Sequence, residues 1–392
     1  MTTVAAPASV LSDELIEACG QRAATYDREN RFFTDDFEAL RAAGYLNVLV
    51  PRGLGGPGLS VAELCKEQER LAYRAPATAV AVNMHLYWTG IARYMRESGD
   101  SSLEWVLRES MAGEVFAAGH AETGNDLAGL LSTARAERVE GGYRFWGRKM
   151  FNSLSPVWTR LGFHAQDNSD PANPIIVHAF LPREADGYRI EETWDTLGMR
   201  ATRSDDTILE GAFVPDRYIA RKIPARGLDL FLLALFGSFM PPLSAVYYGL
   251  ARRAADLAIA TARNKTSLGL TRTMAYHPEI QHLAADMAIE LEAMGAHIER
   301  VADDWSNGVD HGAAWGLKLL ALKYHCTESA KRVVDLAMTM SGGTGMYKRN
   351  ELERLYRDVR CGGFHPANPL LAHEFIGKMA LGVDISDPAR WG

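Results

Sequence analysis

Apolar and polar residues repeat with a helical period in the first part of the chain. From about residue 12 to 115, apolar positions recur at spacings of three and four, as in helices that bury one face. Ser12 precedes an acidic first turn, and Ser60 with Glu63 forms a capping box. Gly44 follows an apolar stretch, as a glycine that ends a helix does. We therefore predict an N-terminal helical domain over residues 1–115.

The pattern becomes strand-like after residue 115. Residues 139–147 form two runs around a Gly-Gly turn, and residues 175–181 and 207–214 add further β-rich runs. Turn signals recur at short intervals, which favours a compact antiparallel barrel or sandwich over alternating strands and helices. We predict a central antiparallel β-barrel domain over residues 116–227.

Long helical patterns return from about residue 228. The most apolar run, residues 231–240, is followed by Pro241 and Pro242. It falls short of the ~20 residues that a membrane span needs, so it predicts a buried helix. Four later segments carry apolar positions at helical spacing, as in an antiparallel bundle: residues 247–264, 278–306, 312–340 and 350–359. The sequence thus predicts an α+β fold in which residues 228–392 form a C-terminal four-helix bundle.

Composition narrows the class of protein. The chain has 392 residues, 47% of them hydrophobic, which predicts two or three substructures around a large core. A net charge of −7 with scattered basic residues argues against a nucleic-acid partner. The four cysteines form no CxxC pair, which fits a reducing cytoplasm and gives no sign of a metal site. The N-terminus lacks the basic start and apolar segment of a signal peptide. We expect a cytoplasmic enzyme with no membrane partner.

Five motifs follow one another along the chain. They are Val50-Pro51 with Gly55-Gly56, Ala121 to Asp126, Gly147 to Ser153, Leu197 to Thr202 with Val214-Pro215, and Ser341 to Gly345. In this order they resemble the motifs of the acyl-CoA dehydrogenases, and residues 357–368 resemble the segment that closes the active site in that family. Each motif alone is weak, but together they span nearly the whole chain. The resemblance implies an acyl-CoA dehydrogenase-like fold made of the three predicted domains.

The resemblance also implies a flavin cofactor, FAD by preference and FMN as the alternative. By resemblance, residues 116–126 and the segment Phe151 to Ser153 line the slot for the flavin ring. The glycine motif serves FAD across a dimer interface in the family, which implies a homodimer or homotetramer. Core packing for Phe151 and a simple helix–helix turn for the glycines stay open as alternatives. The cofactor-binding residues that the resemblance implies are Glu122, Asn125, Phe151, Ser153, Lys265, Thr266, Gly342, Gly343 and Gly345.

The chain departs from the family where proton abstraction occurs. The catalytic glutamate has two alternative positions in acyl-CoA dehydrogenases; Pro366 stands at one and Phe239 falls near the other. Neither side chain can take a proton from a substrate carbon. An arginine that contacts FAD from the partner subunit becomes Asn264, which loses a planar set of donors. We therefore expect weaker flavin retention than in the dehydrogenases.

Histidines stand near the lost base instead. His365 lies one residue before Pro366, His85 lies in the N-terminal helical part, and His120 precedes the altered loop. This arrangement is similar to the flavin-dependent monooxygenases that share the fold, and imidazole can exchange protons near pH 7. Each histidine also has a structural alternative: His85 at a helix interface, His120 in a solvent-facing loop and His365 as a cap of the preceding turn. The predicted catalytic residues are His365, His85 and Asn152.

Three functions follow from these observations. The favoured one is an FAD-dependent monooxygenase that uses reduced flavin and O2 on a small aromatic, heteroatom or amino-sugar substrate, with a separate flavin reductase as a possible partner. The alternative is an acyl-CoA or acyl-thioester dehydrogenase with an atypical base. The third is a non-catalytic or flavin-free relative that acts as a binding or assembly subunit. Fold resemblance alone does not decide between them.

Overall fold

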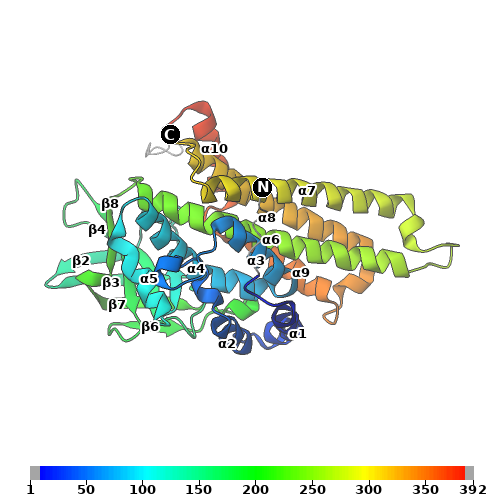
Figure 1. Cartoon of the computed structure of the whole chain (residues 1–392), viewed down its shortest axis with the longest axis horizontal. Helices are drawn as coiled ribbons and strands as arrows, with labels where there is room; N and C mark the ends of the chain where they lie inside the picture. Colours follow the sequence, from blue (N-terminus) through cyan, green and yellow to red (C-terminus); the bar gives the residue numbers. More distant parts are fainter. Residues whose placement is uncertain (1–8, 385–392) are drawn as a thin grey trace.

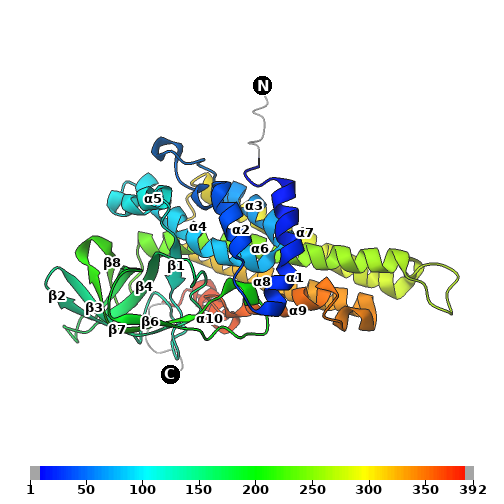
Figure 2. The ribbon, with the colours of Figure 1, turned by 90° about the horizontal axis from the view of Figure 1, so that it is seen from below.

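The computed structural model describes residues 9–384. Figure 1 shows an elongated molecule with a β-sheet at one end and a hairpin of long helices, α6 and α7, reaching to the other. The N-terminal helices are α1 (Asp13–Glu29), α2 (Thr34–Ala42), α3 (Val61–Arg74), α4 (Pro76–Glu97) and α5 (Glu104–Met111). Seen from below, α1 to α3 lie across the long helices (Figure 2). The predicted helical character of this part is confirmed.

The central strands form one sheet, and part of the prediction for it was wrong. The strands are β1 (Phe116–Gly119), β2 (Arg135–Val139), β3 (Gly142–Lys149), β4 (Arg160–Asp167), β5 (Ile175–Pro182), β6 (Tyr188–Glu191), β7 (Asp206–Pro215) and β8 (Ile219–Pro224). Their order is β6-β7-β3-β2-β4-β5-β8, with β1 beside β4. The predicted closed antiparallel barrel is an open, mixed sheet, because β1 and β2 both pair with β4 in parallel and no pairing joins the described edge strands β6 and β8.

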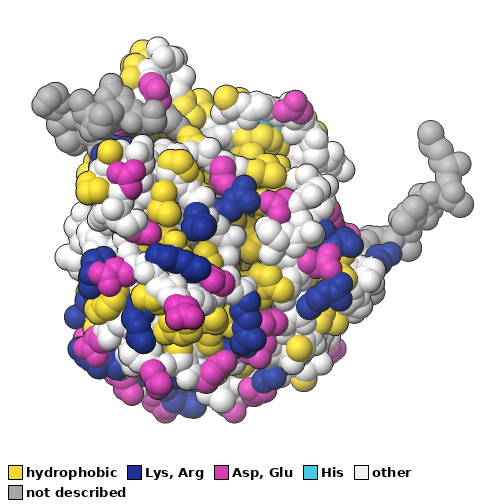
Figure 3. Space-filling view, turned by 90° about the vertical axis from the view of Figure 1, so that its left-hand side faces the viewer, with side chains coloured by type: hydrophobic (Ala, Val, Ile, Leu, Met, Phe, Trp, Pro, Cys, Tyr) yellow, Lys and Arg dark blue, Asp and Glu magenta, His cyan; other side chains and the backbone are white. Residues whose placement is uncertain are grey.

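The parallel pairs arise where separate hairpins meet. Within the hairpins β2–β3 and β4–β5 the pairing is antiparallel, as short turns require. Between β1 and β2 the chain makes a long excursion over residues 120–134, and this loop brings β2 back along the same edge of β4. Such a crossover permits parallel pairing and could not be read from the alternation within each strand. At this end of the molecule, basic and acidic side chains are interspersed on the surface (Figure 3).

The C-terminal helices confirm the predicted helical part. They are α6 (Leu230–Asn264), α7 (Pro278–Ser306), α8 (Ala314–Ser341), α9 (Glu351–Arg360) and α10 (Pro369–Leu381), with the short 3-10 helices η7 (Gly342–Met346) and η8 (Cys361–Phe364) between them. Helices α6, α7 and α8 run along one another, α9 lies alongside, and α10 projects from the body (Figure 1).

Helix α6 is the spine of the molecule. It contacts α3, α4, α7 and α8, and it runs through Pro241 and Pro242, so the helical segments predicted at residues 231–240 and 247–264 form one helix. Among the described residues it is the one helix long and apolar enough to cross a membrane by length and composition, but 78% of its most apolar stretch is buried inside the protein. Its apolar side chains therefore pack in the protein core. Its first half forms one wall of the cavity described next.

Candidate active site

A cavity of about 330 Å³ lies where the three parts of the chain meet. Helix α4 supplies one wall, the start of α6 a second, the sheet and its loops a third, and η8 with the residues after it closes the fourth. Most of the lining is apolar, and the polar groups are few: Tyr87, His120, Ser153, Thr196, Thr202, Ser204, Arg360 and His365. Within residues 9–384, no aspartate or glutamate lines this cavity.

A row of hydroxyls crosses the sheet side of the cavity. The Thr202 hydroxyl donates to the Met199 carbonyl at 2.9 Å, so its oxygen can accept from Ser204 at 2.7 Å. The Ser204 oxygen in turn lies 2.8 Å from the Ser153 hydroxyl. Because this direction uses each hydrogen in the row, the Ser153 oxygen keeps lone pairs for a ligand N–H group. Phe151 stands beside Ser153 with a left-handed backbone (φ 58°) and packs edge-on against Trp194.

His365 lies on the bundle side of the same cavity. Its Nε2 is 2.9 Å from the Tyr247 hydroxyl, and its carbonyl accepts from Lys323 Nζ at 2.9 Å. Lys323 also donates to the Ala367 carbonyl at 2.7 Å, so one amine holds the chain on both sides of Pro366. Burial lowers the pKa of Lys323 to about 7. Burial, with Lys323 nearby, lowers the pKa of His365 to about 3, so the imidazole is neutral at physiological pH.

The Arg-Asp motif holds the closing segment in place. Arg357 makes two hydrogen bonds to Asp27, at 2.9 and 2.6 Å, and Asp358 accepts from the Met199 N–H at 2.6 Å. A Cβ at Gly198 would lie 2.4 Å from the Arg357 carbonyl oxygen, so the loop can approach α9 only with glycine there. The motif residues on these two segments therefore hold the loop around Gly198, which is part of the cavity wall, against α9 of the bundle.

His85 lies outside the cavity. The Phe116 N–H donates to its Nδ1 at 3.0 Å, which places the ring hydrogen on Nε2, 3.0 Å from the Leu46 carbonyl. The side chain is fully buried, and burial lowers its pKa to about 4. With both nitrogens bonded to backbone, His85 connects α4 to its neighbours, which is the helix-interface alternative. The catalytic role predicted for it has no support in this geometry.

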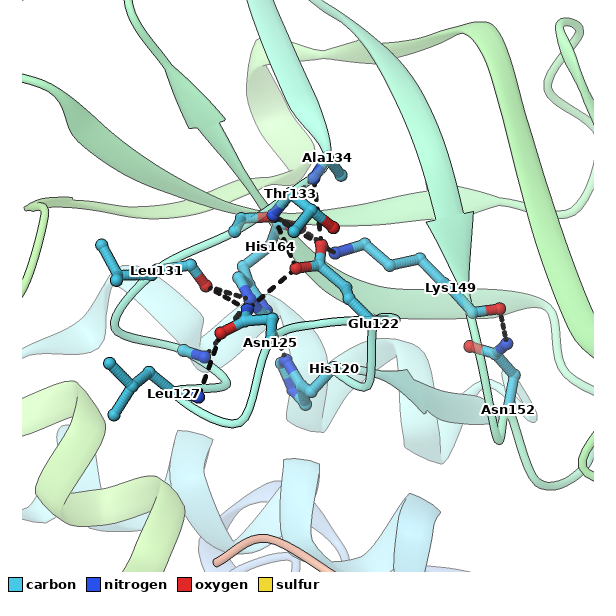
Figure 4. A network of polar contacts seen from close by, with 12 residues as sticks. His120, Glu122, Asn125, Leu127, Leu131, Thr133, Ala134, Lys149, Asn152 and His164 are labelled. Carbon is cyan, nitrogen blue, oxygen red and sulfur yellow. Dashed lines mark hydrogen bonds and ion pairs between the residues drawn. The ribbon is translucent and has the colours of Figure 1, made fainter. Parts of the chain in front are cut away.

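Glu122 and Asn125 form part of a buried network behind the cavity wall (Figure 4). Glu122 pairs with the buried Lys149 amine and accepts from the Thr133 N–H at 2.8 Å and from the Asn125 amide at 2.9 Å. Asn125 also donates to the Leu131 carbonyl at 2.8 Å. These contacts occupy both side chains in shaping the 120–134 loop. Neither side chain lines the cavity, so the flavin contact predicted for them stays a prediction.

Asn152 is also buried behind the wall. Its amide donates to the carbonyls of Lys149 at 2.7 Å and Asp205 at 3.1 Å, which ties the 149–153 segment to the start of β7. Its Oδ1 is buried without a hydrogen-bond partner among the described residues. The structure therefore places Asn152 as a support for Phe151 and Ser153, the two predicted flavin residues that do line the cavity.

The remaining predicted cofactor residues gather elsewhere, at the ends of α6 and α8. Lys265 and Thr266 follow the last residue of α6, and the glycines follow α8 in η7. A Cβ at Gly342 would lie 4.0 Å from Lys265 Nζ, so these two segments are neighbours. None of them lines the cavity of the same chain. The glycines that follow α8 are Gly342, Gly343 and Gly345.

Sequence reasoning missed Tyr87, which lines the cavity, and Lys323, which supports the closing segment behind it. His85 was the predicted catalytic residue of α4. Val80, Met84 and Tyr87 share the helical face of α4 that lines the cavity, and His85 lies off that face. The helical period could have identified Tyr87. Lys323 carries no comparable signal, because a lysine within a helical pattern normally predicts a solvent-facing position.

Comparisons with known proteins agree with this fold. The family model for the acyl-CoA dehydrogenase N-terminal domain matches residues 11–99, and that for the C-terminal domain matches residues 227–364. The putative acyl-CoA dehydrogenase YdbM of Bacillus subtilis (strain 168) is 30% identical over 92% of this chain and 92% of that protein. The chain therefore belongs to the acyl-CoA dehydrogenase family.

A further relative is named for other chemistry, and a solved structure has a similar fold. The amino sugar nitrososynthase DnmZ of Streptomyces peucetius is 28% identical over 91% of this chain and 88% of that protein. A solved structure of KijD3 in complex with FMN and dTDP-3-amino-2,3,6-trideoxy-4-keto-3-methyl-D-glucose is similar with a TM-score of 0.83 at 24% identity, covering 96% of this chain and 93% of that one. This last similarity shows the fold.

The cavity lining fits the flavin that the family implies. A flavin ring needs a flat apolar slot with a few hydrogen-bonding groups at its edge. Phe151, Met150 and Leu232 supply apolar walls, and the hydroxyl row ending at Ser153 supplies the polar edge.

Proposed function

We propose that this protein is a flavin-dependent monooxygenase that uses reduced flavin and O2 on a small organic substrate. The observation that carries the proposal is that no carboxylate lines the cavity within residues 9–384. An acyl-CoA dehydrogenase must remove a weakly acidic proton from carbon, and that step needs a base within hydrogen-bond reach. An oxygenation driven by reduced flavin does not require such a base.

The positions of the missing base support the proposal. Phe239 and Pro366 both line the cavity, beside His365, whose ring centre lies 6.4 Å from that of Phe239. The pKa of His365, lowered to about 3, makes its imidazole a poor acceptor for a carbon-bound proton. The same neutral imidazole is a good hydrogen-bonding group, because one nitrogen donates and the other accepts.

Bound flavin would supply the electrons and the site of O2 activation, while this chain's side chains orient the reactants. The Tyr247 hydroxyl has no other acceptor among the described residues, so it donates to His365 Nε2 and leaves the ring hydrogen on Nδ1. We assign His365 the role of a donor to the reacting groups. The apolar walls exclude water, and Ser153 accepts a hydrogen bond from the ligand.

The names of the relatives support the substrate class. DnmZ is named as an amino sugar nitrososynthase, and the KijD3 structure holds FMN with an amino-sugar nucleotide. We propose an amino-sugar, heteroatom or aromatic substrate, with FAD or FMN delivered in the reduced state by a separate reductase in the cytoplasm.

We propose a homodimer or homotetramer as the working assembly. The segments that contain Lys265 and Gly342 lie together and away from the cavity of their own chain. In the family such segments serve the flavin of a second subunit, so the same placement here suits a flavin shared between copies.

The alternative function, an acyl-thioester dehydrogenase with an atypical base, is favoured by the name of YdbM, a putative acyl-CoA dehydrogenase. Anaerobic mixing of the flavin-loaded protein with a panel of acyl-CoA thioesters separates the two. We expect no bleaching of the flavin absorbance, while dithionite bleaches it fully as a control. Bleaching by any thioester would establish the dehydrogenase instead. If the protein bound no added flavin, the remaining hypothesis would be that it is a flavin-free relative.

A further inference from the structure

A second cleft lies between α1, the start of α9 and the loop around Leu197. Helices α1 and α9 lie side by side there (Figure 2). The volume of the cleft, about 580 Å³, is in the range of about 300–1,000 Å³ that small-molecule sites occupy. Leu197 lines both the cleft and the cavity described above, so the two spaces adjoin at this side chain. The cationic residues of the cleft are Arg28, Arg200, Lys348, Arg349, Arg354 and Arg357.

These six cations share the cleft with three carboxylates, and arginines already occupy all three. Asp27 lies 2.6 Å from Arg357, and Glu353 lies 2.7 Å from the same guanidinium. Glu351 lies 2.6 Å from Arg253, which belongs to α6 and does not line the cleft. The lining therefore has an excess of three positive charges, and its carboxylates are not free to neutralise them.

Three of the cations are exposed and have no ion-pair partner within residues 9–384: Arg28, Lys348 and Arg349. Arg28 donates to the Thr25 hydroxyl at 3.2 Å, and Arg349 packs on the Tyr347 ring at 4.5 Å. Exposed cations are common on protein surfaces, where water solvates them. These three supply charge to the cleft, and a fourth cation points to a missing partner.

That fourth cation, Arg354, is buried. Its side chain is 7% exposed, and a guanidinium has five N–H donors. In the described part of the chain these donors make no hydrogen bond: Nε has no partner, and the nearest carboxylates, of Glu351 and Asp358, lie 3.5 Å away. Charge-assisted hydrogen bonds are about 2.7–2.9 Å long. Because buried polar groups are normally satisfied, Arg354 needs an acceptor from outside these residues.

A diphosphate has the chemistry that this lining would recognise. Arginine binds phosphate oxygens through parallel hydrogen bonds, and lysine adds a point charge on a flexible stem. A diphosphate carries several negative charges, which can match the excess in the cleft, whereas a carboxylate carries one.

We propose that this cleft binds the diphosphate of a nucleotide other than the flavin, and that the rest of this ligand extends past Leu197 into the cavity as the substrate. The diphosphate site stands without the proposed function, whereas its use for a substrate rests on that function. FAD also has a diphosphate, but its predicted contacts include Lys265 and Gly342 of a second subunit. Neither of these residues lines the cleft. The cleft is therefore left for another ligand.

Calorimetric titration of the full chain with ADP and with inorganic diphosphate tests the site. We expect both to bind, and we expect Arg354→Gln to weaken both by about tenfold or more, the scale of a lost hydrogen bond to a charged group. The matched control is Arg332→Gln, because Arg332 pairs with Glu290 on the surface away from the cleft. A wild type that binds neither ligand, or unchanged affinity in Arg354→Gln, would overturn the site.

A variant of the exposed cations covers the case in which Arg354→Gln does not fold. The triple variant Arg28→Gln, Lys348→Gln and Arg349→Gln changes only exposed side chains. We expect it to bind ADP about tenfold more weakly than the wild type and with less dependence on salt, because fewer charges attract the ligand. Wild-type affinity and salt dependence in this variant would contradict the proposed diphosphate contacts.

Titration of the flavin-loaded protein identifies the source of the diphosphate. We expect ADP to bind equally well with FMN or FAD already bound. We also expect ADP-glucose, but not ADP, to perturb the absorbance of bound FMN, because its sugar reaches past Leu197 into the cavity. Exclusion of ADP by FAD but not by FMN would assign the cleft to the flavin and overturn the inference. No perturbation by ADP-glucose would remove the substrate role. A protein that binds ADP but no flavin would refute the proposed function and leave the diphosphate site.

Discussion

Two tyrosine–histidine pairs stand at the same cavity, which Tyr87, His120 and His365 line, and the pairs are held in different ways. At one wall Tyr87 bonds to His120 Nε2 at 3.1 Å, and a second imidazole fixes the ring from behind. At the other, Tyr247 bonds to His365 Nε2 at 2.9 Å, and Lys323 holds the backbone rather than the ring. In the second pair the tyrosine donates to the imidazole, and the histidine hydrogen stays free.

The supports behind these walls also differ. The first wall is supported by the 120–134 loop, which is anchored by an ion pair with complete burial of both side chains, Glu122 and Lys149. The second depends on Lys323, a buried amine that donates only to carbonyls among the described residues, with a pKa lowered to about 7. We therefore expect changes at the first wall to lower the stability of the fold, and the second wall to respond to pH. The predictions below separate the two.

Removing the Lys149 amine should have the largest effect. Lys149→Met leaves the Glu122 carboxylate buried without its cation, and we expect a loss of about 3–5 kcal/mol in the free energy of unfolding. Urea denaturation measures this loss. The double variant Glu122→Gln with Lys149→Met removes both charges and should recover part of it. A loss below 1 kcal/mol in the single variant would show that the ion pair does not support the loop.

His365→Ala should reduce oxygen-dependent product formation by about 10²-fold, the scale of losing a positioned acid, base or donor. Folding should stay intact, because within residues 9–384 the side chain has one hydrogen bond, to Tyr247. The control is His373→Ala, an exposed histidine on α10. Product formation is measured with reduced flavin supplied chemically. Full turnover in His365→Ala would remove its proposed role.

Lys323 should make the second wall sensitive to pH. Its folded-state pKa of about 7 lies below the ordinary lysine value, so the unfolded chain binds more protons above pH 7. The stability of the wild type relative to Lys323→Met should therefore rise with pH between about 7 and 10, by about 1 kcal/mol per pH unit. Urea titrations at several pH values measure this difference. A difference independent of pH would mean that Lys323 titrates normally.

The smallest effect concerns flavin retention. Asn264→Arg restores a planar set of donors at the end of α6, and we expect FAD to bind a few times more tightly. Asn264→Lys adds the same charge without the planar geometry and serves as the control. Equal affinity in both variants and the wild type would indicate that this segment does not reach the flavin.

The sequence predicted the three-part organisation because each part has its own period of apolar residues. It predicted Phe151, Ser153 and His365 at the cavity, since their motifs sit at fixed places in the fold. It could not predict the parallel pairing of β2 with β4, which depends on the path of the 120–134 loop. Nor could it predict the neighbours of His85. A histidine buried between backbone groups and a histidine that lines a cavity look the same in the sequence.

The most direct test of the proposed function is the reaction of the reduced protein–flavin complex with O2 in a stopped-flow instrument. We predict rapid reaction with O2, followed by a slower return of oxidised flavin absorbance than free reduced flavin gives, since the apolar cavity shields the reacting flavin from water. A reduced complex that resists O2 but is formed rapidly from an acyl-CoA thioester would contradict the account and establish a dehydrogenase.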